Sequence, residues 1–291
     1  MSVKHPIISI TGSSGAGTST AKVAFEHIFR REKITPAIIE GDSFHKFDRA
    51  SFKKAAAEYE SNGKRLSHFS ADANELERLA ALFKQYGETG TGDRRLYIHS
   101  EEEGLPYNQA PGTFTPWEKI PEGTDLLFYE GLHGGYNVGN ANVANFVDLL
   151  IGIVPVVNLE WIQKIHRDTK MRGYSSEAVV DTILLRMHDY VHYITPQFTH
   201  ADINFQRVPL VDTSNPFIAR DVPTPDESLL VIHFRKPQQW NIDFSFLLSM
   251  MKDSFMSRPN TIVVPAGKML FAMELILNPI IRDMMARKAK A

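Results

Sequence analysis

A loop rich in glycine and serine, close to the start of the chain, constrains the fold more than any other segment. It reads G-S-S-G-A-G-T-S from Gly12 to Ser19. An apolar run precedes it and apolar residues at helical spacing follow it, so its context is strand, loop, helix. In that setting the glycines let backbone N–H groups turn inward around phosphate oxygens at a helix N-terminus. The alternative is a tight strand-to-helix turn without a ligand.

The loop departs from a phosphate-binding loop at one position. Thr18 stands where that motif carries lysine, so the loop itself supplies no side-chain cation. Ser19 keeps a hydroxyl that can ligate a magnesium ion held by the same phosphates. We therefore expect the missing charge to come from elsewhere, and nucleotide phosphates to bind Gly12, Ser13, Ser14, Gly15, Ala16, Gly17, Thr18, Ser19 and Thr20.

The composition excludes several classes of protein. The chain has 291 residues, of which 43% are hydrophobic, enough for a sizeable core. A net charge of -2 gives no electrostatic case for nucleic acid or a membrane as partner. The chain has no cysteine, which excludes disulfides, thiolate metal sites and thiol switches. We expect a cytoplasmic protein, because no signal-like segment and no run of roughly 18 apolar residues is present.

Strand-like and helix-like segments alternate, which predicts an α/β fold with a mostly parallel sheet and helices on both faces. Expected strands are 7–11, 37–40, 126–130, 149–156, 229–234 and 261–264, and expected helices are 19–31, 73–83, 159–170, 177–192, 244–255 and 268–287. We expect one domain over 1–291. The region 87–123 is rich in glycine and proline, and long loops of this kind usually serve function, so we expect it to cover a substrate.

Asp42 follows the second expected strand, in the stretch E-G-D-S-F-H-K-F-D-R that begins at Glu40. Ligands bind beyond the carboxyl ends of parallel strands, so Asp42 should lie near the phosphate loop. A carboxylate there could accept a proton from a substrate hydroxyl that attacks a phosphorus atom. The alternative is a turn or cap aspartate, because Gly-Asp-Ser is also good turn chemistry.

Three basic residues, His45, Arg49 and Lys53, follow Asp42 at intervals of four. If this stretch is helical, they lie on one face and form a clamp for the phosphate of an anionic substrate. The alternative is a solvated basic face.

A buried-strand pattern, D-L-L-F-Y-E-G, runs from Asp125 to Gly131. A carboxylate at the end of such a strand, downstream of a phosphate loop, typically approaches the magnesium ion and its waters. We therefore expect Glu130 at the metal and Asp125 at the opposite edge of the sheet.

The segment 164–175 contains cations that could replace the missing lysine. Lys164, Arg167 and Asp168 occupy positions i, i+3 and i+4 of one helical face. A mobile lid over about 160–175 could bring these cations over the phosphates, stabilise charge in the transition state and exclude water. Arg172, before a Gly-Tyr-Ser turn, could reach the phosphate of the acceptor. The alternative is an ordinary amphipathic helix with surface ion pairs.

Over nearly its whole length, the chain resembles the phosphoribulokinase family, within the wider group of uridine-kinase-like P-loop kinases. The group-level features are the loop above, E-G-D-S-F-H from Glu40, F-Y-E-G-L-H from Phe128 and K-I-H-R-D from Lys164. Two stretches are more specific to phosphoribulokinases: D-Y-V-H-Y-I-T-P-Q from Asp189 and V-D-T-S-N-P-F from Val211.

The resemblance implies a kinase that uses ATP and Mg²⁺ to phosphorylate the 1-hydroxyl of D-ribulose 5-phosphate, giving ribulose 1,5-bisphosphate for the Calvin cycle. It implies that Asp42 is the catalytic base and that Asp168 is essential, as a base or a metal partner. It also implies that Lys164 and Arg167 act on the transferring phosphoryl group. The residues that it ties to the sugar phosphate are His45, Arg49, Lys53, His99 and Arg172.

The lack of cysteine favours the proteobacterial, allosteric class of that family over the class switched by a cysteine pair. The resemblance to that class implies a homo-octamer activated by NADH and inhibited by AMP. No G-x-G-x-x-G dinucleotide motif is present, so an NADH site would need scattered basic residues, and the candidates are Arg31, Arg235 and Arg258. The alternative for each is a surface arginine.

Two other functions stay open. A uridine- or pantothenate-type small-molecule kinase is disfavoured by the basic cluster after Asp42, which suits a phosphorylated acceptor. A catalytically silent nucleotide-binding regulator is disfavoured because Asp42, Glu130 and Asp168 are all present.

Overall fold

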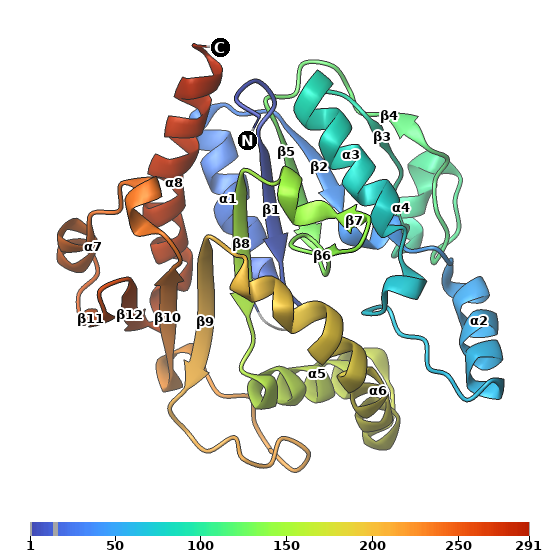
Figure 1. Ribbon diagram of the computed structural model, residues 1–291. Coiled ribbons are helices and arrows are strands. Elements are labelled where there is room, and N and C mark those ends of the chain that lie inside the picture. Colours follow the sequence, from blue (N-terminus) through green and yellow to red (C-terminus); the bar gives the residue numbers. More distant parts are fainter. Residues whose placement is uncertain (1, 14–16, 291) are drawn as a thin grey trace.

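The computed structural model describes residues 2–13 and 17–290, and its centre is one large sheet (Figure 1). The strands of this sheet are β1 (Ile7–Thr11), β2 (Pro36–Glu40), β5 (Leu126–Gly131), β8 (Leu149–Val154), β9 (Ile203–Pro209), β10 (Ser228–Phe234), β11 (Phe255–Arg258) and β12 (Thr261–Pro265). Their order across the sheet is β11-β12-β10-β9-β8-β1-β5-β2. Two short ladders pair β3 (Asp93–Arg94) with β4 (Glu118–Lys119) and β6 (Asn137–Val138) with β7 (Ala141–Asn142).

The five strands β2, β5, β1, β8 and β9 run parallel to one another. The other three, β10, β12 and β11, extend the sheet in antiparallel fashion. The loops after β1, β2, β5 and β8 therefore all leave from one edge, where ligands bind in sheets of this type. The predicted mostly parallel sheet is confirmed.

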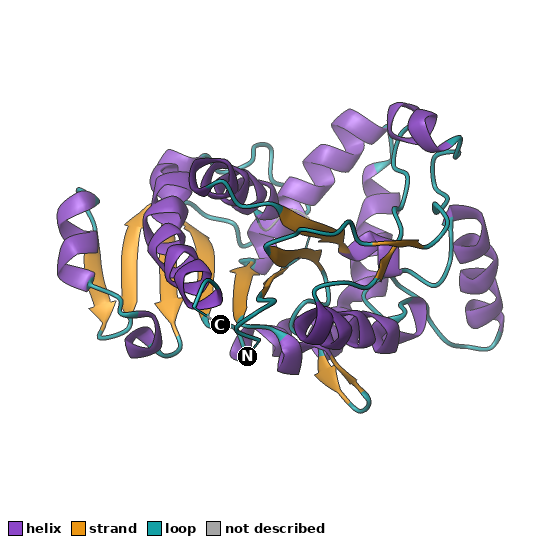
Figure 2. Ribbon diagram, turned by 90° about the horizontal axis from the view of Figure 1, so that it is seen from above, coloured by secondary structure: helices purple, strands orange, loops and turns teal. Residues whose placement is uncertain are grey.

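Helices cover both faces of the sheet, as Figure 2 shows from above. They are α1 (Thr18–Glu32), α2 (Arg49–Ser61), α3 (Leu76–Thr89), α4 (Glu101–Gly104), α5 (Val157–Arg172), α6 (Ser176–Asp189), α7 (Phe244–Met250) and α8 (Met269–Lys288). Along β5, Phe128 belongs to the core under α1 and α8, and Tyr129 to the core under α3. This alternation follows from the two-residue period of a strand.

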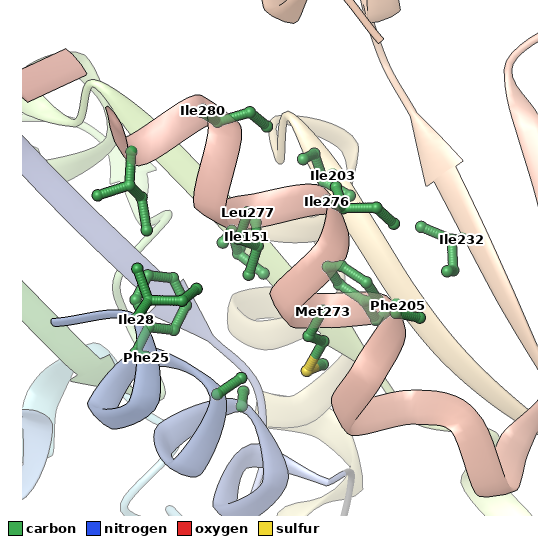
Figure 3. Packing of buried hydrophobic residues seen from close by; sticks show 14 of the residues in the cluster. Phe25, Ile28, Ile151, Ile203, Phe205, Ile232, Met273, Ile276, Leu277 and Ile280 are labelled. Carbon is green, nitrogen blue, oxygen red and sulfur yellow. The ribbon is translucent and has the colours of Figure 1, made fainter. Parts of the chain in front are cut away.

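The larger core lies between the sheet and the helices α1 and α8 (Figure 3). Apolar side chains of α8 meet those of α1 and of the central strands there, and the labelled ones are Phe25, Ile28, Ile151, Ile203, Phe205, Ile232, Met273, Ile276, Leu277 and Ile280. A separate small core of Ile165, Val179 and Ile183 joins α5 to α6, beyond the carboxyl ends of the parallel strands. The pair α5–α6 thus has its own packing.

The six predicted strands are confirmed, but β9 and β11 were not predicted. In β9 the apolar Ile203 and Phe205 alternate with polar Asn204 and Gln206, over too few residues to stand out. The predicted helix 244–255 is wrong at its end: α7 stops at Met250, and the chain turns at Asp253 (φ 64°) into β11.

Other boundaries also differ from the prediction: the helix predicted over 73–83 is α3, Leu76–Thr89, and the strand predicted over 149–156 ends at Val154. The predicted helix 177–192 ends at Asp189 and continues as a π-helical turn, Tyr190–Ile194. The irregular region 87–123 begins later than predicted, because α3 runs through Gly87 and is capped by left-handed Gly90. Over the described ranges, no helix is both long and apolar enough to cross a bilayer.

Candidate active site

Two glycines shape the loop between β1 and α1. A Cβ on Gly12 would lie 2.8 Å from the carbonyl oxygen of Ile153, so β8 passes too close for any side chain. Gly17 caps α1 with a φ of 111°, in the region that favours glycine. The first N–H groups of α1 therefore point toward the carboxyl edge of the sheet, as an anion site requires. The predicted contacts of Ser14, Gly15 and Ala16 lie outside the described residues.

Thr18 is the first residue of α1, and its side chain hydrogen-bonds Glu130 at the end of β5. Ser19, the next residue, is exposed. Burial raises the pKa of Glu130, and the charge of Lys22 and the bond from Thr18 only partly oppose this rise. Lys22 lies one turn further along α1 and pairs with Glu40 Oε1 at 3.3 Å. Glu130 thus lies at the strand edge predicted for it, in a carboxylate-rich setting.

Asp42 lies in a short 3₁₀ turn, Gly41–Phe44, that follows β2 directly. Its carboxylate is half-exposed and has a histidine on each side: Nε2 of His45 is 3.2 Å from Oδ1, and Nε2 of His99 is 3.7 Å from Oδ2. Burial alone would raise the pKa of Asp42, but the hydrogen bond and charge of His45, with the charge of His99, outweigh it and lower the pKa. Asp42 is therefore ionised at neutral pH and able to accept a proton.

The expected helical stack of His45, Arg49 and Lys53 is wrong for its first member. His45 has extended backbone angles and is buried, whereas α2 begins only at Arg49, where Asp48 caps it through Ser51 N–H. Arg49 and Lys53 are exposed and share one face of α2. His45 is thus separated from the other two and directed at Asp42.

The glycine- and proline-rich region packs against the turn that carries Asp42. Arg95 in this region donates to the carbonyl oxygens of Ser43 (2.8 Å) and His45 (2.6 Å) and pairs with Glu75 at 3.1 Å. Its guanidinium lies 3.7 Å from the ring centre of Phe114. The same region brings His99 to Asp42, so it fixes the backbone and one flank of the candidate base.

Lys164, Arg167 and Asp168 meet on α5 as predicted, but the arrangement is buried. Asp168 accepts from Lys164 Nζ at 2.5 Å and from Arg167 Nε at 3.0 Å, and its side chain is only 5% exposed. Burial opposes ionisation of Asp168, but the bonds from both cations outweigh it and lower its pKa. The burial of Asp168 favours the predicted cluster over the alternative of surface ion pairs. Arg186, from α6, adds further positive charge near Asp168.

Glu160, in the first turn of α5, connects this cluster with the phosphate loop. Burial raises its pKa to about 7, and the nearby Ser13 hydroxyl, together with the charges of Lys164 and Arg167, limits the rise. The position of the Glu160 carboxylate between the phosphate loop and the cations Lys164 and Arg167 was not predicted. It results from the packing of α5 against the loop, which the sequence does not indicate. Arg172 is the last residue of α5.

The three candidate effector arginines lie away from this site. Arg31 lies near the end of α1 and forms an ion pair with Glu274 at 3.3 Å. Arg235 follows β10 and forms an ion pair with Asp202 at 2.8 Å. Arg258 is the last residue of β11. The strand directions put all three toward the amino edge of the parallel strands. Arg235 also lines a cavity of about 330 Å³ on the β8–β10 part of the sheet.

Gln197 is the last residue of the stretch D-Y-V-H-Y-I-T-P-Q, which is more specific to phosphoribulokinases, and its side chain links two segments beside the site. Its Oε1 accepts from Thr11 Oγ1 and Gly135 N–H, both at 2.9 Å, and its Nε2 donates to the Leu132 carbonyl at 2.8 Å. It therefore ties the end of β1 to the turn after β5. No sequence motif links Gln197 to Thr11 or Leu132, so this role could not be predicted from the sequence.

Replacing Glu160 with glutamine should remove a pH dependence of stability. Because its pKa in the folded state is about 7, above the ordinary 4.5, the folded state binds the proton more tightly and loses stability as pH rises from 4.5 to 7. We expect Glu160→Gln to flatten that slope and to raise the free energy of unfolding at pH 8 by up to about 3 kcal/mol. Chemical denaturation at fixed protein concentration measures both. Glu26→Gln, at an exposed site on α1, should keep the slope, and an unchanged slope in Glu160→Gln would contradict the assignment.

Comparison with known proteins agrees with this geometry. A family model described as "Phosphoribulokinase / Uridine kinase family" matches residues 7–214. The chromosomal phosphoribulokinase of Cupriavidus necator is 59% identical over 292 residues, covering 100% of this chain and 99% of that protein. The phosphoribulokinase of Rhizobium meliloti is 59% identical over 288 residues, 99% of each chain.

A solved structure is equally similar. Phosphoribulokinase from Rhodobacter spheroides is 54% identical, superposes with a TM-score of 0.90, and the match covers 99% of this chain and 100% of that one. The family model matches more than half of the chain, and these relatives match along nearly its full length. The chain therefore belongs to the phosphoribulokinase and uridine kinase family of P-loop kinases.

Proposed function

We propose that the protein transfers the γ-phosphoryl group of ATP to the 1-hydroxyl of D-ribulose 5-phosphate and so makes ribulose 1,5-bisphosphate for the Calvin cycle. The observation that carries this proposal is the ionised carboxylate of Asp42, held between two histidines at the strand edge that also carries the phosphate loop. The choice of acceptor rests on relatives that are named phosphoribulokinases and on the cations near Asp42.

Asp42 acts as the general base. Its carboxylate accepts the proton of the 1-hydroxyl while the hydroxyl oxygen forms a bond to the γ-phosphorus and the bond from that phosphorus to the bridging oxygen of ADP breaks. The low pKa of Asp42 keeps it ionised before the reaction. Asp168 is a less suitable base because both of its oxygens accept from cations, and we assign it the role of holding Lys164 and Arg167.

The sugar phosphate binds above the exposed face of α2. Arg49 and Lys53 are one turn apart there, and Arg49 N–H donates to the carbonyl oxygen of Gly112 at 2.8 Å, which links α2 to the glycine- and proline-rich region. His99 lies in that region, Arg172 is the last residue of α5, and we propose that both bind the sugar phosphate. We propose that this region covers the substrate, and that the sheet and its insertions form one domain.

ATP and magnesium fit the loop and the strand ends. Mg²⁺ typically takes one or two carboxylates and completes its shell with phosphate oxygens and waters. Glu130 supplies a carboxylate, and Ser19 is the predicted hydroxyl ligand. Among the described residues no three histidines or acids are grouped to hold a metal alone, so the phosphates must contribute to its binding. Lys164 and Arg167 neutralise charge on the transferring group when α5 closes as a lid.

Regulation and assembly form a second part of the proposal. We propose a homo-octamer activated by NADH, with Arg31, Arg235 and Arg258 as effector residues. These arginines lie toward the amino edge of the parallel strands, and the proposed reaction takes place at the carboxyl edge. This separation and the cavity beside Arg235 support a separate regulatory site. Large apolar side chains exposed on α6, on the π-helical turn that follows it and on the 210–218 segment support self-association. They include Leu184, Leu185, Val191, Leu210 and Ile218.

The acceptor identifies the function. Purified protein with ATP and Mg²⁺ should produce ADP rapidly with ribulose 5-phosphate and at a background rate with uridine or pantothenate. A coupled assay with NADH-independent detection of ADP avoids any effect of NADH on the enzyme. Faster turnover of uridine or pantothenate would support the small-molecule kinase instead, and no turnover with any acceptor, despite ATP binding, would support a silent nucleotide-binding protein.

Replacing Asp42 with asparagine should abolish most of the turnover without preventing ATP binding. Losing a general base costs at least ~10² in kcat, while the loop and α1, which bind the phosphates, are untouched. Steady-state kinetics and equilibrium ATP binding measure the two effects. Turnover within a few-fold of the wild type would show that another group takes the proton.

A further inference from the structure

His45 and Asn74 face each other across a backbone bridge. The two residues pair in antiparallel fashion, and the N–H groups of Lys46 and Glu75 donate across the bridge at 2.8 and 2.7 Å. Side chains of facing residues lie next to each other in such a pair. Both are buried, His45 at 7% and Asn74 at 3% exposure, so their side chains are held together in one arrangement.

The hydrogen bonds of Asn74 fix which way its amide points. Its Nδ2 donates to the carbonyl oxygens of His68 (2.9 Å) and Ser70 (2.7 Å). A flipped amide would set its oxygen against those two carbonyl oxygens. Oδ1 therefore faces Nδ1 of His45, at 2.8 Å, and can only accept there. It follows that Nδ1 of His45 carries a hydrogen.

This assignment restricts what the other ring nitrogen can do. Nε2 of His45 lies 3.2 Å from Oδ1 of Asp42. With a hydrogen on Nδ1, a neutral ring would point a lone pair at the carboxylate and repel it. The contact is favourable when Nε2 also carries a hydrogen, so that the ring donates from both sides, to Asn74 and to Asp42.

A stack of rings prevents His45 from turning away. The ring of His68 lies 4.5 Å from that of His45, and Phe52 of α2 stacks on the far side of His68 at 3.9 Å. Burial, with a smaller effect from the charges of His45 and Arg186, lowers the pKa of His68 to about 3. His68 therefore packs as a neutral ring, and His45 is the member of the stack that contacts Asp42.

We propose that Asn74 is a positioning residue for the phosphoryl transfer: it holds His45 in the form that donates to Asp42 and thereby orients the carboxylate toward the acceptor hydroxyl. The inference rests on the proposed function and deepens it. Arg49, Lys53, His99 and Arg172 then remain the candidates for the sugar phosphate, and His45 acts through the base. Asn74 lies 29 residues from His45 in the sequence, and no spacing pattern links them.

A double-mutant cycle tests whether Asn74 acts through His45. We expect Asn74→Ala to lower kcat/KM for ribulose 5-phosphate about tenfold in the wild-type background, and less than about twofold in a His45→Gln background, because contacting residues are not additive. Asn62→Ala makes the same change at an exposed asparagine that caps the end of α2, away from His45, and should stay within about twofold of wild type. Losses that multiply in the double variant, or an equal loss in Asn62→Ala, would overturn the proposal.

Nitrogen NMR of the histidine rings gives a readout that does not depend on turnover. With His45→Gln used to assign its signals, Nδ1 of His45 should show the shift of a protonated nitrogen in the wild type and should lose it in Asn74→Ala. An unprotonated Nδ1 in the wild type would overturn the proposal. If the wild type fails to phosphorylate ribulose 5-phosphate but shows this signature, the proposed function fails while the Asn74–His45 arrangement stands.

Discussion

The common edge formed by the carboxyl ends of β1, β2, β5 and β8 is the constraint on which the site depends. Because these strands run parallel and in register, the residues that follow each of them emerge side by side. The phosphate loop, the Asp42 turn, Glu130 and the start of α5 each come from a different strand end. None of these groups is close to another in sequence, and each reaches the edge at the end of a strand of the same sheet.

Positive charge at this edge is separated from the loop that binds the phosphates. Thr18 contacts Glu130, and the cations Lys164 and Arg167 lie on α5, where they share the carboxylate of Asp168. Two cations and one carboxylate keep a net positive charge, and the shared partner holds both side chains close together. The helix pair α5–α6 has its own small core, and this separate packing supports the proposal that α5 closes as a lid. On that proposal, the loop without lysine binds the phosphates without a cation of its own, and closure of α5 supplies the charge.

The sequence predicts the features that local patterns determine. The strand Ile7–Thr11, the helix that begins at Thr18, the strand that ends near Glu130 and the helical face of Lys164 are all where their spacing placed them. The features that long-range packing determines were missed. His45 leaves the expected helix because its backbone pairs with Asn74, and Arg95 reaches the Asp42 turn from a region that has no regular pattern.

The same contrast explains the other errors. The strand β9 has polar residues on one face, and its position beside β8 is visible only once the sheet is assembled. The raised pKa of Glu160 arises from burial against the loop, which no property of residue 160 alone indicates. Residue types predicted the chemistry well, whereas the groups that hold a catalytic side chain in place required the structure.

The turnover number of Thr18→Lys tests most directly whether the charge has moved from the loop to α5. A lysine at this position would lie against Glu130, and Lys164 and Arg167 already supply the cations, so kcat for ribulose 5-phosphate should not rise. A large gain in kcat would contradict the account, because it would show that the site lacks charge and that α5 does not provide it.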